Sequence, residues 1–172
     1  MGCLGMSPSK SYFKVAVLTL SNSKRLANDE SGKFLRNSIR SAHCLLEHQH
    51  VKDDVYQMRA VLSRWIANSK INVIITTGGT GFGHCDITPE AIEPLLDKKI
   101  AGFGELFRQI SYDSIGSTTI QSRCIAGLAN NTVIFCLPSS LNACETAWEG
   151  IISTQLDENA QECNFLRQLS VS

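Results

Sequence analysis

The sequence predicts an α/β fold in which a mostly parallel sheet is covered by helices on both faces. Three apolar runs rich in β-forming residues indicate buried strands. Segments with apolar residues three and four positions apart lie between and after these runs, which is the spacing of a helix with one buried face. Because apolar strands that alternate with amphipathic helices form parallel sheets, this order of elements predicts the fold class.

Length, composition and charge predict one domain. The chain has 172 residues, 43% of them hydrophobic, which suffices for one sizeable core. We expect the domain over residues 13–157, between a flexible leader (1–12) and a polar tail (158–172). Equal numbers of basic and acidic residues provide no general attraction to nucleic acid or to an anionic membrane. With no apolar run of membrane-spanning length and no secretory signal, we expect a cytoplasmic location.

The first half of the chain contains two strands and two helices. Residues 13–20 (FKVAVLTL) predict a buried strand that ends in a polar loop. Apolar residues then recur at the helical period, at Leu35, Ile39, Ala42 and Leu46. A second helix is predicted after Asp54 over residues 55–66, and a short strand over 73–75 leads into the glycine-rich loop 78–83.

The second half adds three helices and one strand. Thr88, Pro89 and Glu90 favour a helix start with Thr88 as the cap. Residues 102–112 predict another short helix, and 132–137 (TVIFCL) predict the third buried strand. Asn142, with Glu145 three residues later, resembles a capping box that opens the last helix.

Three loops follow the three apolar strands: 21–23, 77–86 and 138–142. In a parallel sheet these loops gather at the carboxyl edge of the strands, where ligands bind. The middle loop is the most informative, because Gly78, Gly79 and Gly81 allow a ligand to approach the backbone closely and a helix start follows at Thr88.

This combination suits an anion. The hydroxyls of Thr77 and Thr80 can bond phosphate or carboxylate oxygens, and Asp86 can hold a magnesium ion that bridges to them. The alternative is a glycine-rich turn in which Asp86 only caps the following helix. The dinucleotide and P-loop patterns are both excluded, because His84 and Cys85 occupy positions that those patterns reserve for other residues.

Other polar residues leave two interpretations open. Asp53 and Asp54 can share a metal ion or cap the helix that follows. Arg123 can bind a ligand anion or form an internal salt bridge. We expect structural roles at a helix end for the histidines, and buried thiols among apolar neighbours for three cysteines. These residues are His43, His48 and His50, and Cys44, Cys124 and Cys136. No C-x-x-C pair occurs, which argues against a cysteine zinc site.

Several segments resemble the molybdopterin-binding family over residues 15–157. They read TTGGTGFGHCDITPEAIEPLLDKKIAGFGELFRQISY, then IGSTTIQSR and AGLAN, and earlier VKDDVYQMRAVLSRWIA. The resemblance implies a three-layer α/β/α domain that assembles into a homotrimer or homohexamer. It also implies that molybdopterin, a pterin dithiolene phosphate, or a precursor of it, binds at the strand-end loops.

In active members of this family, the terminal phosphate of molybdopterin attacks the α-phosphorus of magnesium-bound ATP and releases pyrophosphate. By similarity, Asp53 and Asp86 are the acids that place Mg²⁺. The ligand-loop residues are likewise carried over by similarity: Gly78, Gly79, Thr80, Gly81, Ser122, Arg123, Pro138, Ser139 and Ser140.

Four positions depart from the family pattern. Asn22 replaces an acid in the first loop, Cys85 replaces an arginine, and in the third loop Ser139 replaces a glycine and Leu141 a proline. Each change argues against catalysis and leaves the fold prediction intact. Three hypotheses follow: a molybdopterin-binding protein of molybdenum cofactor biosynthesis, an active adenylyltransferase, and an oligomeric carrier or scaffold without chemistry.

Overall fold

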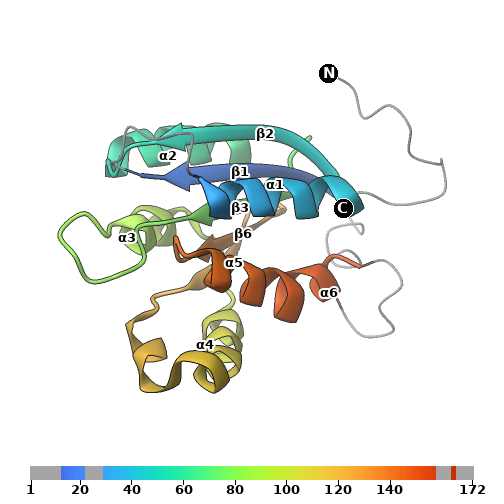
Figure 1. Ribbon diagram of the computed structural model, residues 1–172. Helices are drawn as coiled ribbons and strands as arrows, with labels where there is room; N and C mark the ends of the chain where they lie inside the picture. The colour runs from blue at the N-terminus through green and yellow to red at the C-terminus, as the bar shows by residue number, and fades with distance from the viewer. Residues whose placement is uncertain (1–12, 22–28, 158–163, 166–172) are drawn as a thin grey trace.

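The computed structural model describes residues 13–21, 29–157 and 164–165. Its centre is a six-stranded sheet with the order β2-β1-β3-β6-β5-β4 (Figure 1). The strands are β1 (Lys14–Leu20), β2 (Cys44–Val51), β3 (Val73–Thr77), β4 (Lys98–Lys99), β5 (Ile125–Ala129) and β6 (Thr132–Leu137). The first three strands and β6 pair in parallel, whereas β5 pairs antiparallel with both of its neighbours, β6 and β4. The expected mostly parallel sheet is therefore confirmed.

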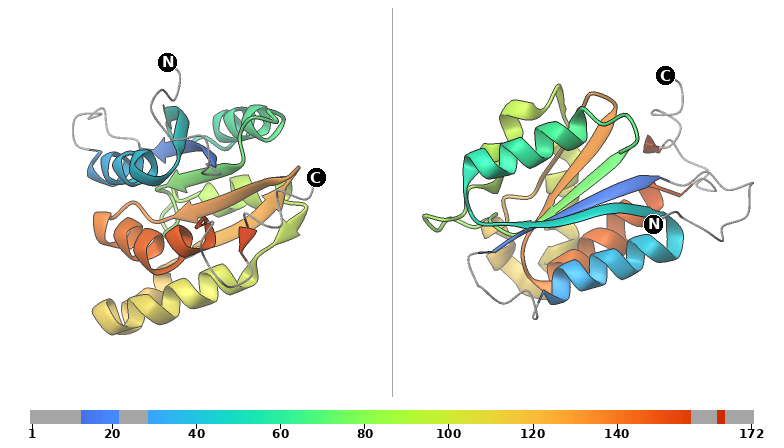
Figure 2. Two further views of the ribbon diagram at one scale, coloured as in Figure 1. Left: turned by 90° about the vertical axis from the view of Figure 1, so that its right-hand side faces the viewer. Right: turned by 90° about the horizontal axis from the view of Figure 1, so that it is seen from above.

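Helices cover both faces of this sheet, which gives the three layers of an α/β/α sandwich (Figure 2). Residues of α1, α4 and α5 share one apolar cluster with the sheet, and residues of α2 and α3 share the other. The helices are α1 (Glu30–Ala42), α2 (Val55–Ile66), α3 (Thr88–Ile92), η2 (Glu93–Leu95), α4 (Ala101–Ile115), η3 (Gly116–Gln121), α5 (Leu141–Ala147), η4 (Trp148–Ile152) and α6 (Ser153–Gln155).

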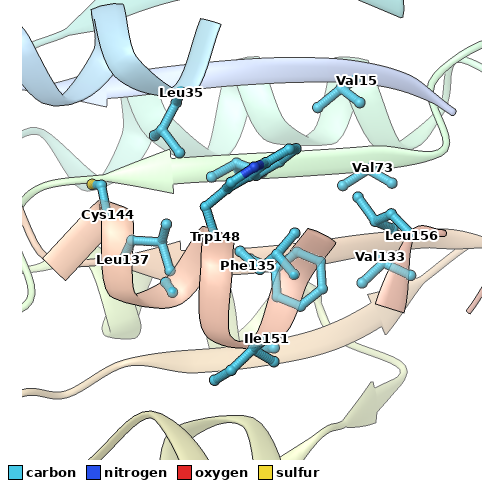
Figure 3. Packing of buried hydrophobic residues seen from close by; sticks show 14 of the residues in the cluster. Val15, Leu35, Val73, Val133, Phe135, Leu137, Cys144, Trp148, Ile151 and Leu156 are labelled. Atoms are coloured by element: carbon cyan, nitrogen blue, oxygen red, sulfur yellow. The ribbon is translucent and has the colours of Figure 1, made fainter. Parts of the chain in front are cut away.

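The three strands that the sequence predicts form the middle of the sheet. Every residue of β3 and β6 is buried, as are all residues of β1 except the first. Helices lie on both sides of these strands, so both faces of each strand must be apolar. On one face, Trp148 packs among Val15, Val73 and Phe135 (Figure 3).

Three strands were not predicted: β2 and β4 at the two edges, and β5 (Ile125–Ala129) beside β4. The sequence of β2 is CLLEHQHV, whose polar residues hide the strand pattern, and Leu46 was expected on the first helix. That expectation is wrong, because α1 ends at Ala42 and β2 begins at Cys44. His43 lies at the end of α1 as expected, but His48 and His50 lie in β2.

A register shift separates the two ends of the β1–β2 pairing. Val15 pairs with Leu45, but Ala16 pairs with Glu47, so Leu46 is the extra residue of a bulge. After the bulge, His48 and His50 pair with Val17 and Thr19 and lie on the α1 face. On the opposite face, the Glu47 carboxylate accepts a hydrogen bond of 2.8 Å from the indole N–H of the fully buried Trp65.

Two helix starts differ from the sequence prediction. Thr88 is the first residue of α3 rather than its cap, and its hydroxyl donates to the Gly78 carbonyl over 2.8 Å. For α5, the cap is Ser140 rather than Asn142, since the Ser140 hydroxyl accepts from the Ala143 amide. In both cases the conformation of the loop decides which hydroxyl forms a hydrogen bond to the backbone, and residue spacing alone does not predict that conformation.

Further sequence predictions concern the chain ends and the cysteines. Residues 1–12 and most of 158–172 lie outside the described residues, although Phe165 packs its ring against Phe135 with centroids 6.2 Å apart. Cys124 and Cys136 are buried thiols as expected. Cys44 is disulfide-bonded instead, a difference that apolar neighbours cannot predict because thiols and disulfides are both apolar. Within the described residues, no helix is long and apolar enough to span a bilayer.

Candidate functional site

The loops after β3 and β6 enclose a cavity of about 370 Å³ at the carboxyl edge of the sheet. Its third wall is the carboxyl half of α4 together with the segment that leads to β5. The lining residues are Gly79, Thr80, Gly81, Asp86, Phe107, Ser111, Ser114, Ile115, Gln121, Ser122, Pro138, Ser139, Ser140, Asn142 and Ala143. Eight of the residues predicted from the sequence therefore lie around one cavity.

The glycines at 78 and 79 are required by the backbone. Both have positive φ, 108° and 66°, a region that residues with a side chain rarely adopt. A Cβ atom at Gly78 would lie 2.5 Å from the Leu20 carbonyl oxygen, and one at Gly79 would lie 2.3 Å from the Thr88 hydroxyl. Gly78 thus serves the close approach of β1 and β3, while Gly79 turns the chain into the cavity.

Thr77 has a structural role in the site. Its hydroxyl is buried and donates to the Pro138 carbonyl over 2.8 Å, which ties the loop after β3 to the loop after β6. Thr77 and Gly78 are not among the cavity-lining residues, whereas the buried Thr80 is. The predicted contact of the Thr77 hydroxyl with a ligand therefore stays a prediction, and the structure gives this hydroxyl a partner within the protein.

Arg123 holds the glycine-rich loop in place. Its guanidinium donates to the carbonyls of Gly81 and Asp86 over 2.8 and 2.6 Å and pairs with the Glu90 carboxylate. The same group lies over the Phe82 ring, 5.2 Å from the ring centroid. Of the two interpretations from the sequence, the structure contains the internal salt bridge. Although burial alone would raise the pKa of Glu90, the hydrogen bond from Arg123 holds it below its ordinary value.

Asp86 fixes the loop through one carboxylate oxygen. Oδ2 accepts a hydrogen bond of 2.7 Å from the Gly83 amide, so Asp86 closes its own loop and does not cap α3. The residue also lines the cavity. A carboxylate with oxygens close to glycine amides and to a cavity provides the hard oxygen ligands that Mg²⁺ prefers.

Asp53 and Asp54 have different roles. Asp54 is the cap of α2, since its carboxylate accepts from the Gln57 amide over 2.8 Å. Asp53 does not cap the helix, and its pKa is raised by burial and by the nearby negative charge of Asp86. The structure thus brings the two predicted magnesium acids close enough for their charges to interact, from loops after two different strands.

The remaining predicted residues lie on the wall formed by the loop after β6 and the segment before β5. The Ser122 hydroxyl contacts the Cys124 sulfur at 3.1 Å, and the Ser139 carbonyl accepts from the Ser31 hydroxyl over 2.6 Å. The Ser139 backbone does not need glycine, because Asn130 and Asn131 are the non-glycine residues with positive φ in the described ranges. Asn22 lies outside the described residues, and Cys85 is exposed in its loop.

The contribution of α4 to the site was not predicted from the sequence. Phe107, Ser111, Ser114 and Ile115 line the cavity. Polar Ser111 and Ser114 follow the apolar residues of this helix at helical spacing, which was the available signal. The signal is weak, because serines on a short helix ordinarily face solvent, and only the fold shows that this end of α4 faces the glycine-rich loop.

The fold and the cavity define a ligand-binding α/β domain with its site at the carboxyl ends of parallel strands. Within that class, the chain belongs to the family described as the probable molybdopterin binding domain, whose model matches residues 16–158.

Known relatives cover nearly the whole chain. Molybdenum cofactor biosynthesis protein B of Escherichia coli K12 is 46% identical over 153 residues, 88% of this chain and 90% of its own. The protein of the same name from Staphylococcus epidermidis is 39% identical over 155 residues, 87% of this chain and 88% of its own.

Solved structures agree with this assignment. A crystal structure of molybdenum cofactor biosynthesis protein B superposes with a TM-score of 0.86 at 32% identity and covers 94% of this chain and 98% of its own. The tungsten cofactor synthesizing protein MoaB of Pyrococcus furiosus has a TM-score of 0.77 at 35% identity, with 84% and 93% covered. The three-layer molybdopterin-binding fold expected from the sequence is confirmed.

Proposed function

We propose that this protein acts in molybdenum cofactor biosynthesis by binding molybdopterin, or a precursor of it, in the cavity between the loops after β3 and β6. The observation that carries the proposal is the cavity itself. Its walls combine glycine backbone at 79 and 81 with the apolar side chains of Phe107 and Ile115. The family match and the names of the relatives favour this ligand among other small anions.

The two sides of the cavity suit the two parts of such a ligand. A pterin is a flat heterocycle that packs well on apolar side chains, and Phe107 and Ile115 provide them on α4. A phosphate group needs hydrogen-bond donors, and the glycine-rich loop together with the hydroxyls of Ser111 and Ser122 lies on the cavity wall. Net charge of zero fits a small-molecule ligand rather than nucleic acid.

Adenylyl transfer from ATP is the second candidate function, and it rests on Asp53 and Asp86. Burial and the nearby charge of Asp86 raise the pKa of Asp53, and a divalent cation bound at this place would offset both effects. These residues would hold Mg²⁺, which supplies charge neutralisation for phosphate groups. The chain's own contribution to such a transfer is to orient the pterin phosphate against the glycine-rich loop.

The experiment that tests both functions is an anaerobic incubation of the purified protein with molybdopterin and MgATP, followed by chromatography of the pterin products. Retained and unmodified pterin supports binding without chemistry, as in a carrier. Adenylylated pterin at catalytic yield, together with pyrophosphate release, supports the transferase. If no pterin is retained and no product forms relative to a protein-free control, the proposed function is wrong.

We also propose that the protein acts as a cytoplasmic homotrimer or homohexamer. Support for the oligomer comes from exposed apolar side chains on α4 and η3, where Leu106, Tyr112, Ile115 and Ile120 are between 41% and 73% exposed. Tyr112 and Ile115, three residues apart, lie on the same side of α4, and exposed apolar side chains that group together mark an interaction site. Ile115 also lines the cavity, so assembly at this surface would occur next to the ligand.

A further inference from the structure

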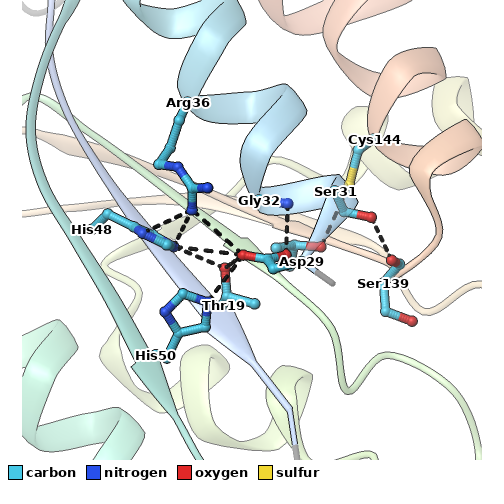
Figure 4. Close-up of polar contacts among 10 residues, drawn as sticks. Thr19, Asp29, Ser31, Gly32, Arg36, His48, His50, Ser139 and Cys144 are labelled. Atoms are coloured by element: carbon cyan, nitrogen blue, oxygen red, sulfur yellow. Dashed lines mark hydrogen bonds and ion pairs between the residues drawn. The ribbon is translucent and has the colours of Figure 1, made fainter. Parts of the chain in front are cut away.

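A polar cluster on the α1 face of the sheet is separate from the two magnesium acids. It consists of Asp29 before α1, and of His48 and His50 on β2 (Figure 4). The carboxylate oxygen Oδ2 of Asp29 lies near the Nε2 atoms of both histidines. Each of the three side chains offers one atom that can bind a metal, and these atoms lie within 4.8 Å of one another.

We propose that Asp29, His48 and His50 form a binding site for one divalent transition-metal ion, with Zn²⁺ as the reference ion. Neither the family assignment nor the proposed function requires this site. Two imidazole nitrogens and one carboxylate oxygen form a ligand set that suits Zn²⁺, Co²⁺ or Fe²⁺ and does not suit Mg²⁺, which prefers oxygen alone.

The distances fit such an ion. The Nε2 atom of His50 lies 3.0 Å from Oδ2 of Asp29, and Nε2 of His48 lies 3.8 Å from the same oxygen. Ligand atoms at about 2.0–2.2 Å from a tetrahedral zinc ion are about 3.4 Å apart. The two distances from Oδ2 of Asp29 lie on either side of this separation, so small side-chain rotations would bring the atoms to it. Asp29 keeps its cap function at the same time, since Oδ1 accepts from the Gly32 amide and Oδ2 faces the histidines.

The surroundings prepare the three ligands. Thr19 Oγ1 lies 3.1 Å from both Oδ2 of Asp29 and Nε2 of His48, so one hydroxyl holds these two ligand atoms close together until a metal ion replaces its contact with Nε2. The side chains of Asp29, His48 and His50 are 10%, 16% and 27% exposed, which leaves a path for the ion.

Arg36 competes with a cation at this cluster. Its Nη1 atom lies 2.9 Å from Nδ1 and 3.2 Å from Nε2 of His48, a position over the ring rather than in its plane. It also lies 3.5 Å from Oδ2 of Asp29. Because the arginine does not occupy the in-plane lone pair of His48, metal binding requires that the guanidinium turn toward solvent and that the Thr19 hydroxyl release Nε2. Removal of its charge should therefore strengthen metal binding, which distinguishes a metal site from a plain ion-pair network.

The test uses tag-free protein carrying Cys85→Ser, because that exposed thiol is a competing metal ligand. After treatment with a chelator, the protein is titrated with Zn²⁺ by calorimetry and with Co²⁺ by visible absorption. We expect one equivalent to bind, with affinity reduced on the order of 100-fold in His48→Gln and His50→Gln. His84→Gln, a matched change of a histidine in the exposed loop, should leave the affinity unchanged, and Arg36→Met should increase it.

A second measurement does not depend on the folding of a histidine variant. Nitrogen-15 spectra of the imidazole side chains, recorded on the Cys85→Ser protein with and without Zn²⁺, should show shifts at His48 and His50 and none at His84. Absence of stoichiometric Zn²⁺ binding, or binding without these shifts, would overturn the proposal. Unchanged affinity in both His48→Gln and His50→Gln would overturn it as well. A pterin-binding assay on the same samples tests the proposed function independently of the metal site.

Discussion

Asp86 shows how one side chain serves both the structure and the chemistry of the site. Its Oδ2 atom accepts from the Gly83 amide, and its charge raises the pKa of Asp53. The first task needs only an oxygen acceptor, whereas the second needs a negative charge. A substitution that keeps the oxygen and removes the charge can therefore separate the two.

For Asp86→Asn we expect pterin binding to remain and any adenylyl transfer to be abolished. The amide oxygen can still accept from Gly83, but the charge that helps to hold Mg²⁺ is lost. In the same variant, the pKa of Asp53 should fall toward its ordinary value, measured by carboxyl carbon-13 titration, because one cause of its elevation is gone. Unchanged turnover would remove Asp86 from the mechanism, and an unchanged Asp53 titration would contradict the contact between the two charges.

His43 makes stability depend on pH. It is buried between Phe13 and Trp148, and burial lowers its pKa below 6.5, an effect that Asp157 partly offsets. Because the unfolded chain then binds the proton more readily, this contribution to stability is complete above pH 6.5 and is lost as the pH falls toward the folded-state pKa.

Consequently, the Tm of the wild-type protein should fall between pH 7.5 and pH 5, and His43→Leu should make that fall shallower. Leucine keeps an apolar side chain in the site and removes both the titration and the buried Nδ1 atom that has no hydrogen-bond partner. Differential scanning calorimetry at several pH values measures the effect. Parallel Tm curves for the two proteins would show that another group causes the dependence.

At the scale of whole elements, the strands β1, β3 and β6 were predictable, whereas the edge strands β2 and β4 and the strand β5 beside β4 were not. The strands β1, β3 and β6 are apolar on both faces because helices cover both sides, so pattern alone finds them. The edge strand β2 carries Glu47, His48 and His50 among its residues, and polar side chains at an edge remove the apolar run by which strands are recognised. Only two residues form β4, too few for any pattern.

Among the residues of the site, too, some could be predicted from the sequence and others could not. The glycines at 79 and 81 and the acid at 86 were predicted because glycine spacing and an acid are visible in sequence. The role of Arg123 was left open, since its partners lie in a loop about 40 residues away and contacts at that distance depend on the fold. The α4 wall was missed for the same reason.

The start of α2 offers a matched pair of neighbouring acids. Asp54→Ala should lower the free energy of unfolding by about 1 kcal/mol, because it removes the cap that accepts from Gln57. Asp53→Ala should leave stability unchanged or slightly higher at pH 7, since the folded protein disfavours the charge of Asp53. Urea denaturation of the two variants checks this difference. An equal loss in both would show that the cap is shared.

At the scale of the whole molecule, the site lies next to the surface proposed for assembly. The apolar residues of α4 and η3 are on the opposite layer from α2, whose Tyr56 is 79% exposed. Because Tyr56 lies away from the surface proposed for assembly, a substitution there serves as a control for substitutions on η3. An assembly through α4 and η3 would also place a second copy beside the cavity wall at Ile115.

We therefore expect Ile120→Lys to reduce the sedimentation coefficient of the assembly, because a charge is costly in an apolar contact, and Tyr56→Lys to leave it unchanged. Sedimentation velocity at several protein concentrations distinguishes these results. A monomeric wild-type protein would contradict the oligomer, and equal effects of the two substitutions would place the contact elsewhere.

The bulge at Leu46 gives β2 one residue that its pairing with β1 does not use. Deletion of Leu46 would therefore keep the later pairs, with Glu47 beside Trp65 and the two histidines beside Asp29. An insertion between His48 and His50 would instead turn one of the two histidines to the other face of the sheet, away from Asp29. Natural variation in this strand should therefore include loss of the bulge residue, whereas single-codon insertions after it should be rejected there and tolerated in the loops.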